Sequence, residues 1–189
     1  MSELREAKVL HGFRFALIGA LAANHYMAPR YSADIDFAVL ERDAIAVEEH
    51  LRAERWQMVG GLVMTDLTGT TWRAVGGGQV DLVYLPDSWG SPALDMASTN
   101  VLDGVPTVTL PYLVLMKLLA ARGKDTADVE ELLVGKSRAR VVEVREVVGR
   151  FGRPGDLEDL DQIIELSAWR TSRARTSPPR RRGPSPRGG

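Results

Sequence analysis

Cysteine is absent from all 189 residues of the sequence. This absence excludes a disulfide framework, thiolate metal sites and a cysteine nucleophile. Aromatic residues make up only 6% of the chain, so aliphatic side chains must supply most of a hydrophobic core. No run reaches the roughly 20 apolar residues that a membrane-spanning helix needs, and the first residues lack the basic-then-apolar order of a signal peptide. These absences predict a soluble, cytoplasmic protein with no membrane partner.

Several common catalytic motifs are missing as well. The three histidines have no His-x-x-x-His spacing, which argues against a zinc site. No Gly-x-Ser-x-Gly segment is present to form the nucleophile elbow of a serine hydrolase. A Walker-type phosphate loop is missing too, because the glycine run 76–78 is not followed by a lysine and a helix.

Charge is distributed unevenly along the chain. Residues 170–189 contain seven arginines and no acid, whereas residues 1–169 contain 17 basic and 25 acidic residues, a net charge of −8. The acidic body argues against broad, non-specific nucleic-acid binding by the folded part. The Arg/Pro-rich end is expected to be disordered and to attract RNA or an acidic partner, or else to be a solvated extension with no dedicated role.

The hydropathy pattern predicts an α+β fold, with a small mixed sheet followed by a helical C-terminal half. We expect a sheet-containing core over 1–109, a helical part packed on it over 110–169 and a disordered tail over 170–189. The predicted strands are 13–18, 34–40, 62–67, 70–75 and 79–85, with turns at 68–69 and 76–78. The predicted helices are 20–27, 43–54, one capped by Ser88 or Ser91 and ending near 97, then 113–122, one starting at 125, 137–150 and 156–169.

Two carboxylates flank an apolar residue in Asp34-Ile35-Asp36. Residues at i and i+2 of a strand point to the same side, roughly 7 Å apart at their roots. Such a pair repels itself unless a cation lies between the two groups. Two Mg²⁺ ions about 3.5–4 Å apart, as used in phosphoryl displacement, would satisfy it. The alternation of 34–40 predicts a strand with one dry face, formed by Ile35, Phe37 and Val39. The alternative to a metal site is an edge strand whose acids face water, and the motif alone favours this alternative.

Asp81 lies within the otherwise apolar segment 79–85. A lone carboxylate is costly to bury there without a partner. If this strand neighbours 34–40, Asp81 becomes the third member of a metal-binding triad; otherwise it lies on an exposed face. Asp66 competes for the same role, although its threonine flanks indicate a strand end.

Residues before the acidic motif suggest a phosphate site. Gly19 ends one predicted strand and opens a helix, where free N–H groups and a helix dipole favour an anion, or where the chain simply turns tightly. Arg30 and Ser32 would supply a guanidinium and a hydroxyl to the same phosphate. Arg30 would equally pair with a surface acid.

Lys117 is the one charged residue in the run 110–121. Its ammonium points either to a triphosphate or, by snorkelling, to water, and the sequence gives the two interpretations equal weight. The neighbouring charges Lys124, Asp125 and Asp128 are interpreted as capping and helix-surface groups.

Taken together, these residues resemble the polymerase-beta-like minimal nucleotidyltransferases, most closely the AbiEii-type abortive-infection toxins. The resemblance spans about residues 13–133. It rests on Gly19 at a strand end, Arg30-Tyr31-Ser32-Ala33-Asp34-Ile35-Asp36, Asp81 on a later strand, Lys117, and Lys124-Asp125-Thr126-Ala127-Asp128. The family usually has Gly or Ser where this chain has Ala20, so a hydroxyl contact to phosphate is lost while the backbone amides remain.

The resemblance implies a nucleotidyltransferase fold and transfer of a nucleoside monophosphate from an NTP to a hydroxyl. Asp34 and Asp36 would bind two Mg²⁺ ions, which Mn²⁺ can replace, and Asp81 would be a further ligand or the base. Gly19, Ala20, Arg30, Ser32 and Lys117 would bind the nucleotide.

The expected acceptor is RNA, such as a tRNA end, or a protein, ahead of a small molecule. A toxin–antitoxin or phage-defence role with a cognate antitoxin is also implied. The alternative is a catalytically silent module with the same fold.

Overall fold

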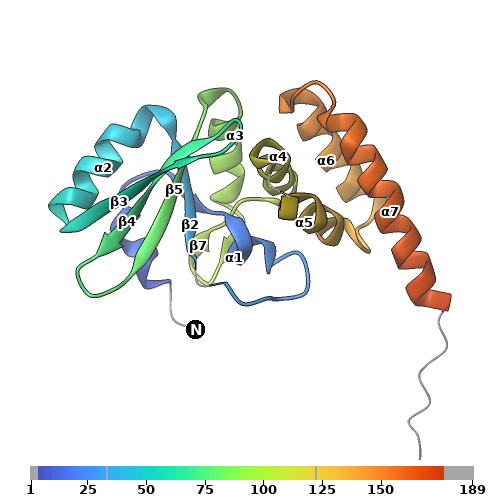
Figure 1. The fold of residues 1–189 in the computed structure, drawn as a ribbon, viewed down its shortest axis with the longest axis horizontal. Coiled ribbons are helices and arrows are strands. Elements are labelled where there is room, and N and C mark those ends of the chain that lie inside the picture. The colour runs from blue at the N-terminus through green and yellow to red at the C-terminus, as the bar shows by residue number, and fades with distance from the viewer. Residues whose placement is uncertain (1–3, 33, 122, 177–189) are drawn as a thin grey trace, which may run out of the picture.

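The computed structural model describes residues 4–32, 34–121 and 123–176. Five strands form one mixed sheet in the order β1-β2-β5-β4-β3. The central strands β2 and β5 are parallel, and the other neighbours are antiparallel. The strand bounds are Phe15–Leu17 (β1), Asp36–Leu40 (β2), Trp56–Val63 (β3), Thr68–Ala74 (β4) and Gln79–Leu85 (β5). The predicted α+β class is confirmed (Figure 1).

Helices cover both faces of the central strands. Helix α2 (Ala44–Ala53) packs on one face, where Glu48 accepts a hydrogen bond from the Tyr84 hydroxyl. Helix α3 (Asp87–Ala97) packs on the other, where Gly90 lies against Leu85. All four residues of 37–40 are therefore buried, and the predicted single dry face of this strand is wrong. A parallel strand covered on both faces has no reason to alternate in polarity.

The hairpin of β3 and β4 differs from the sequence prediction. Strand β3 begins at Trp56 rather than 62, and the turn lies at residues 64–67, where the Met64 N–H bonds to the Leu67 carbonyl. The two glycines at 60–61 hid this strand in the sequence. Gly69, predicted in a turn, lies within β4. A glycine is needed there, because a Cβ at this position would come 2.0 Å from the Leu82 carbonyl oxygen. The glycine therefore permits a close backbone approach. The turn at 76–78 is confirmed.

Four helices form the C-terminal half: α4 (Leu110–Ala120), α5 (Gly123–Leu133), α6 (Arg138–Phe151) and α7 (Asp156–Thr176). They lie together on one side of the sheet (Figure 1). Helix α4 ends at Ala120 rather than at the predicted residue 122, and Ala121 after it adopts a left-handed conformation. Helix α7 continues to Thr176, past the predicted helix end at 169 and into the segment 170–189. Residues 177–189 of that segment lie outside the described residues.

Short elements complete the fold. These are two 3-10 helices, η1 (Arg5–Leu10) and η2 (Glu41–Asp43), the five-residue helix α1 (Gly19–Ala23), and the small ribbon of β6 (Val101–Leu102) and β7 (Val105–Pro106). None of the helices within the described ranges is long and apolar enough to cross a membrane.

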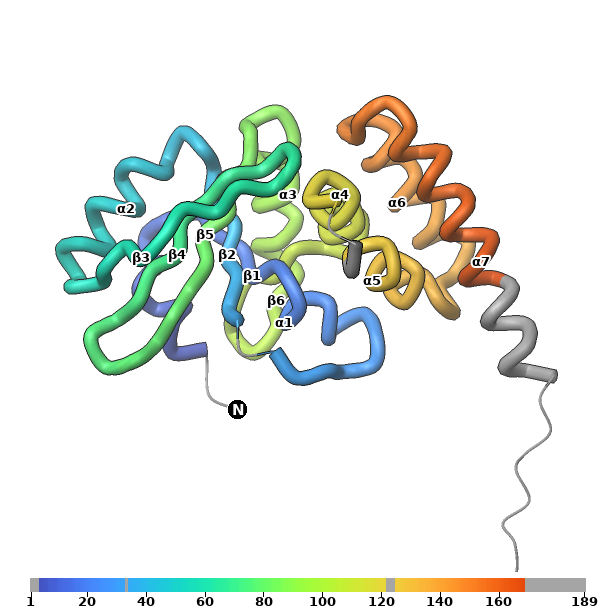
Figure 2. Tube along the Cα trace, viewed as in Figure 1, coloured from blue at the N-terminus to red at the C-terminus, as the bar shows by residue number. Residues whose placement is uncertain are grey.

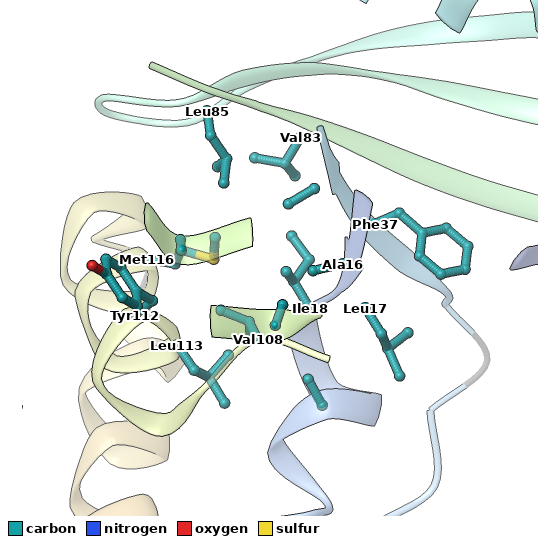
Figure 3. Packing of buried hydrophobic residues seen from close by; sticks show 14 of the residues in the cluster. Ala16, Leu17, Ile18, Phe37, Val83, Leu85, Val108, Tyr112, Leu113 and Met116 are labelled. Carbon is teal, nitrogen blue, oxygen red and sulfur yellow. The ribbon is translucent and has the colours of Figure 1, made fainter. Parts of the chain in front are cut away.

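One hydrophobic core joins the sheet to the helical half. Nearly every side chain of α4 is buried, which makes it the central helix of that half. Figure 3 shows Leu113 and Met116 of α4 beside Ile18 and Val108, with Val83 of β5 nearby. The sheet and the helices are thus held in one fixed arrangement, which places α4 opposite one face of the sheet.

Two helical glycines provide a test of this packing. A Cβ on Gly90 would lie 2.6 Å from the Leu85 Cβ and 3.0 Å from Leu40 Cδ2, so Gly90→Ala should lower the free energy of unfolding by about 1–3 kcal/mol. A Cβ on Gly149 of α6 would meet Leu157 at an ordinary 3.5 Å, so Gly149→Ala should raise it by about 0.5–1 kcal/mol. Urea unfolding of both variants measures the two signs, and equal effects would contradict the close packing of α3.

Candidate functional site

A cavity of about 270 Å³ lies between one face of the sheet, the β3–β4 turn and helix α4. Its walls combine acidic, basic and apolar side chains. Figure 3 shows four of its apolar residues, Ile18, Val83, Leu113 and Met116. The structure brings all eight predicted site residues to this one cavity: Gly19, Ala20, Arg30, Ser32, Asp34, Asp36, Asp81 and Lys117.

The acidic wall comes from the two parallel central strands. Asp36, the first residue of β2, is paired directly with Asp81 of β5, and the Asp81 N–H donates to the Ile35 carbonyl at 2.9 Å. Directly paired residues point to the same side of a sheet, so both carboxylates belong to the face that borders the cavity. Both residues are half-buried, whereas Asp34 lies before the strand and is exposed. The strand that contains Asp81 is therefore the neighbour of the strand that contains Asp36, as a metal site shared by these residues requires.

Gly19 is required beneath the Asp36 carboxylate. Its φ is +66°, and a Cβ at this position would lie 2.0 Å from Asp36 Oδ2. The Ile18 N–H donates to the Asp36 carbonyl at 2.9 Å, which fixes the end of β1 against β2. Helix α1 has only five residues, so its dipole adds little, and the polar groups at Gly19 and Ala20 are those of the backbone.

Arg30 and Ser32 lie in the loop between α1 and β2. The Asn24 side chain holds this loop by exchanging two hydrogen bonds with the Arg30 backbone, at 2.8 and 3.0 Å. The Arg30 guanidinium is 2.7 Å from Asp128 Oδ1, an acid that is buried rather than on the surface. The Ser32 hydroxyl donates to the Asp34 carbonyl at 3.2 Å, which stabilises the loop just before the acidic motif.

Lys117 is buried in an ion-pair network. Its side chain is 7% exposed, and its ammonium lies 3.2 Å from Asp125 Oδ1 and 2.5 Å from Asp128 Oδ2. The snorkelling interpretation of Lys117 is therefore wrong. Asp125 and Asp128 are 2% and 3% exposed, so their assignment as capping and helix-surface charges is also wrong. Both acids lie on α5, which packs against α4 and places them beside the lysine. The side chain of Lys124 lies outside the described residues.

Opposing effects set the pKa of Asp128. Burial alone would raise it, but hydrogen bonds from Arg30 and Lys117, together with their positive charges, lower the pKa below its usual value. Asp128 is therefore an anion that binds two cations of the cavity wall at once.

Asp81 has a partner that the sequence analysis did not identify. The Thr71 hydroxyl on β4 donates to Asp81 Oδ1 at 2.7 Å, because Thr71 is the residue paired with Asp81. A threonine in a predicted strand carries no signal by itself, and only the pairing register reveals the contact.

Asp66 does not belong to this cavity. It lies in the β3–β4 turn, where it forms an ion pair with Arg153 at 3.0 Å. The same turn lies beside α4 (Figure 2), and the Thr65 hydroxyl donates to the Ala120 carbonyl at 3.5 Å. The end of β3 and the turn therefore close the cavity with an apolar wall, formed by Leu62 and Val63 of the strand and by Met64 and Leu67 of the turn.

Carboxylate oxygens are the ligands that Mg²⁺ prefers, and it commonly uses one or two of them together with water and substrate phosphate. Asp36 and Asp81 provide such a pair. Within the described part of the chain, no group of three or more His, Asp or Glu side chains is gathered closely enough to hold a metal ion by itself. The donor set therefore fits Mg²⁺ that shares its ligands with a phosphate, and does not form a closed cage.

Comparison with known proteins gives little further information. No family model matches the chain, and no curated protein matches its sequence. Among solved structures, it is similar to the solution structure of the antibiotic-resistance factor ANT(2'')-Ia, for which substrate-regulated conformation dynamics are described. The match has 11% identity and a TM-score of 0.46, and covers 90% of this chain and 95% of the other. A likeness of this degree assigns neither a family nor an activity.

Gly19→Ala should displace the Asp36 carboxylate. Gly135 is a matched control, since its φ is +71° and nothing lies within 4 Å of its Cβ position. Gly135→Ala should cost about 1 kcal/mol of unfolding free energy from backbone strain alone. Gly19→Ala should cost about 1–3 kcal/mol more, because its Cβ also overlaps a carboxylate. Urea unfolding measures both costs, and equal values with Asp36 unmoved in a crystal structure would contradict the close contact.

Lys117→Met should destabilise the protein at pH 7 by about 3–5 kcal/mol, because two buried carboxylates lose their shared cation. The loss should shrink as the pH falls toward about 4, since Asp128 without Lys117 takes up a proton that the wild type still excludes. Arg30→Met, at a half-exposed residue, should cost less. Urea unfolding at several pH values measures these differences. A loss that stayed constant with pH would show that the network is not electrostatic.

Proposed function

We propose that this chain is a metal-dependent nucleotidyltransferase. It moves a nucleoside monophosphate from an NTP to an acceptor hydroxyl and releases pyrophosphate. One observation carries the proposal: Asp36 and Asp81 are directly paired on adjacent parallel strands and, with Asp34, border one cavity that also contains Arg30 and Lys117. Carboxylates facing cations across a small cavity suit a substrate that is itself an anion bound through a metal.

The residues divide the work of the reaction between them. Asp34, Asp36 and Asp81 would hold two Mg²⁺ ions, for which Mn²⁺ could substitute. When bound, the metal supplies charge neutralisation on the phosphates. Asp81 also takes the proton of the acceptor hydroxyl as its oxygen bonds to the α-phosphorus and the bond to pyrophosphate breaks. The protein's contribution is positioning and electrostatics, with no covalent intermediate.

The nucleotide-binding residues act through different groups. Gly19 and Ala20 offer backbone N–H groups, and Ser32 holds the loop that carries Asp34. Arg30 and Lys117 neutralise phosphate charge, and Asp128 holds both cations in the cavity wall until a phosphate competes for them.

We further propose RNA or protein, ahead of a small molecule, as the acceptor, and a cytoplasmic toxin of the AbiEii type as the biological role. The resemblance in residues 13–133 supports the toxin role. The seven arginines of 170–189 favour RNA, since a cationic segment attracts polyanions.

The charge balance of the cavity favours a second candidate. The two cations already face two buried carboxylates, and the three cavity aspartates are not assembled as a metal cage. A catalytically silent module that uses this fold only for binding would have the same features.

Incubation with each α-labelled NTP, Mg²⁺ and either total RNA or lysate protein tests the enzyme. We expect label in one fraction, and a loss of at least about 100-fold in Asp36→Asn, because that variant removes a ligand of the reacting centre. Asp103→Asn is the matched control, since Asp103 is exposed on the β6–β7 turn and asparagine tolerates its left-handed backbone.

Binding of the NTPs, measured with and without Mg²⁺, separates the two candidates. Metal-dependent binding with no transfer to any acceptor would favour the silent module. Binding that is indifferent to both Mg²⁺ and Asp36→Asn would overturn the enzyme proposal.

A further inference from the structure

We propose that Thr71 is a positioning residue for the Asp81 carboxylate, an inference that rests on the function proposed above. Its hydroxyl holds Oδ1 of Asp81 and leaves Oδ2 for the metal ion or the acceptor proton. The orientation of the Asp81 carboxylate would then depend on a neutral side chain from β4, a strand whose described residues do not line the cavity.

The contact is fixed by the sheet rather than by a flexible loop. Thr71 and Asp81 are directly paired on antiparallel strands, and both lie within the strands rather than at a fraying end. Directly paired side chains are about 4.5–5.5 Å apart at their Cβ atoms, within reach of one hydrogen bond. The observed 2.7 Å from Oγ1 to Oδ1 is a short, charge-assisted distance.

One donor on one oxygen sets the rotation of a carboxylate. The terminal torsion of aspartate is broad and nearly two-fold, so an unsupported carboxylate samples a wide range of orientations. Within the described residues, Oδ2 of Asp81 has no hydrogen-bond partner, whereas Oδ1 has Thr71. The two carboxylate oxygens therefore differ before any ligand binds: Oδ1 already accepts a hydrogen bond, and Oδ2 is the oxygen left to bind a metal ion or a proton.

The chain provides a matched control at the adjacent residue. Thr70 also lies on β4 and is part-buried, but its side chain is on the opposite face. There its hydroxyl is 2.5 Å from the Tyr84 hydroxyl and accepts from Trp72 Nε1 at 2.8 Å. Thr70→Val therefore breaks more hydrogen bonds than Thr71→Val, but touches nothing in the cavity.

The experiment compares Thr71→Val, Thr71→Ser and Thr70→Val with the wild type. Binding of Mn²⁺ without nucleotide, followed by the electron paramagnetic resonance signal of the free ion, should weaken about 10–100-fold in Thr71→Val, as is typical when a supporting hydrogen bond to a metal ligand is lost. Thr71→Ser should stay within about threefold because it keeps the donor. Thr70→Val should also stay within about threefold, despite its larger loss of stability.

Kinetics and crystallography add independent readouts. At saturating metal, kcat of Thr71→Val should fall by a larger factor than the KM for NTP rises, because Asp81 also takes the proton of the acceptor hydroxyl. A crystal structure of the same variant should show the Asp81 carboxylate rotated from its wild-type position. Equal Mn²⁺ affinity in Thr71→Val and Thr70→Val, with Asp81 unrotated, would overturn the proposal.

Failure of this inference can be distinguished from failure of the proposed function. If the wild type neither binds Mn²⁺ nor transfers nucleotide, the proposed function fails, and the Asp81 rotation in Thr71→Val still decides whether Thr71 orients it. If the wild type is active and Thr71→Val matches it in metal affinity, kcat and Asp81 orientation, only the role of Thr71 is lost.

Discussion

The parallel pairing of β2 with β5 is the constraint on which the site depends. It sets Asp36 beside Asp81, two like charges that a fold without a ligand would gain by separating. The neighbouring residues hold the two carboxylates close together rather than separating them. Gly19 leaves room for one carboxylate where any side chain would displace it, and Thr71 donates to the other. The backbone at Gly19 and the neutral hydroxyl of Thr71 thus help to accommodate two carboxylates side by side.

The basic groups of the cavity are organised in the opposite way. Lys117 and Arg30 come from parts of the chain far apart in sequence, and one carboxylate, that of Asp128, joins them. A buried lysine is costly unless it is paired, so the acids of α5 permit Lys117 to lie among the apolar residues of α4. The pairing also means that a phosphate must compete with Asp128. Phosphate, with more charge and more acceptor oxygens than a carboxylate, is suited to that competition.

The sequence contained enough to predict the α+β class and to name the residues that border the cavity. Polar residues in unusual places were the signal, since Asp81 in an apolar strand and Lys117 in an apolar helix each imply a partner. The sequence did not reveal which residues of neighbouring strands are paired. Thr71 looks like any strand threonine until the pairing of β4 with β5 places it beside Asp81. Asp125 and Asp128 look like ordinary helix-start acids until the packing of α5 on α4 places them beside Lys117. The start of β3 was missed because Gly60 and Gly61 interrupt its pattern.

The cavity also shows why the chain functions as one unit rather than as a sheet with an attached helical part. Leu113, Met116, Lys117 and Ala120 recur at the spacing of one helix face, and this face forms the wall opposite the carboxylates. The β3–β4 turn closes the gap between them, held to α4 by Thr65 and to Arg153 by Asp66. A ligand between these walls contacts both halves at once. Its binding energy is therefore coupled to the packing of α4 on the sheet, and a change in that packing alters the site without altering any residue in it.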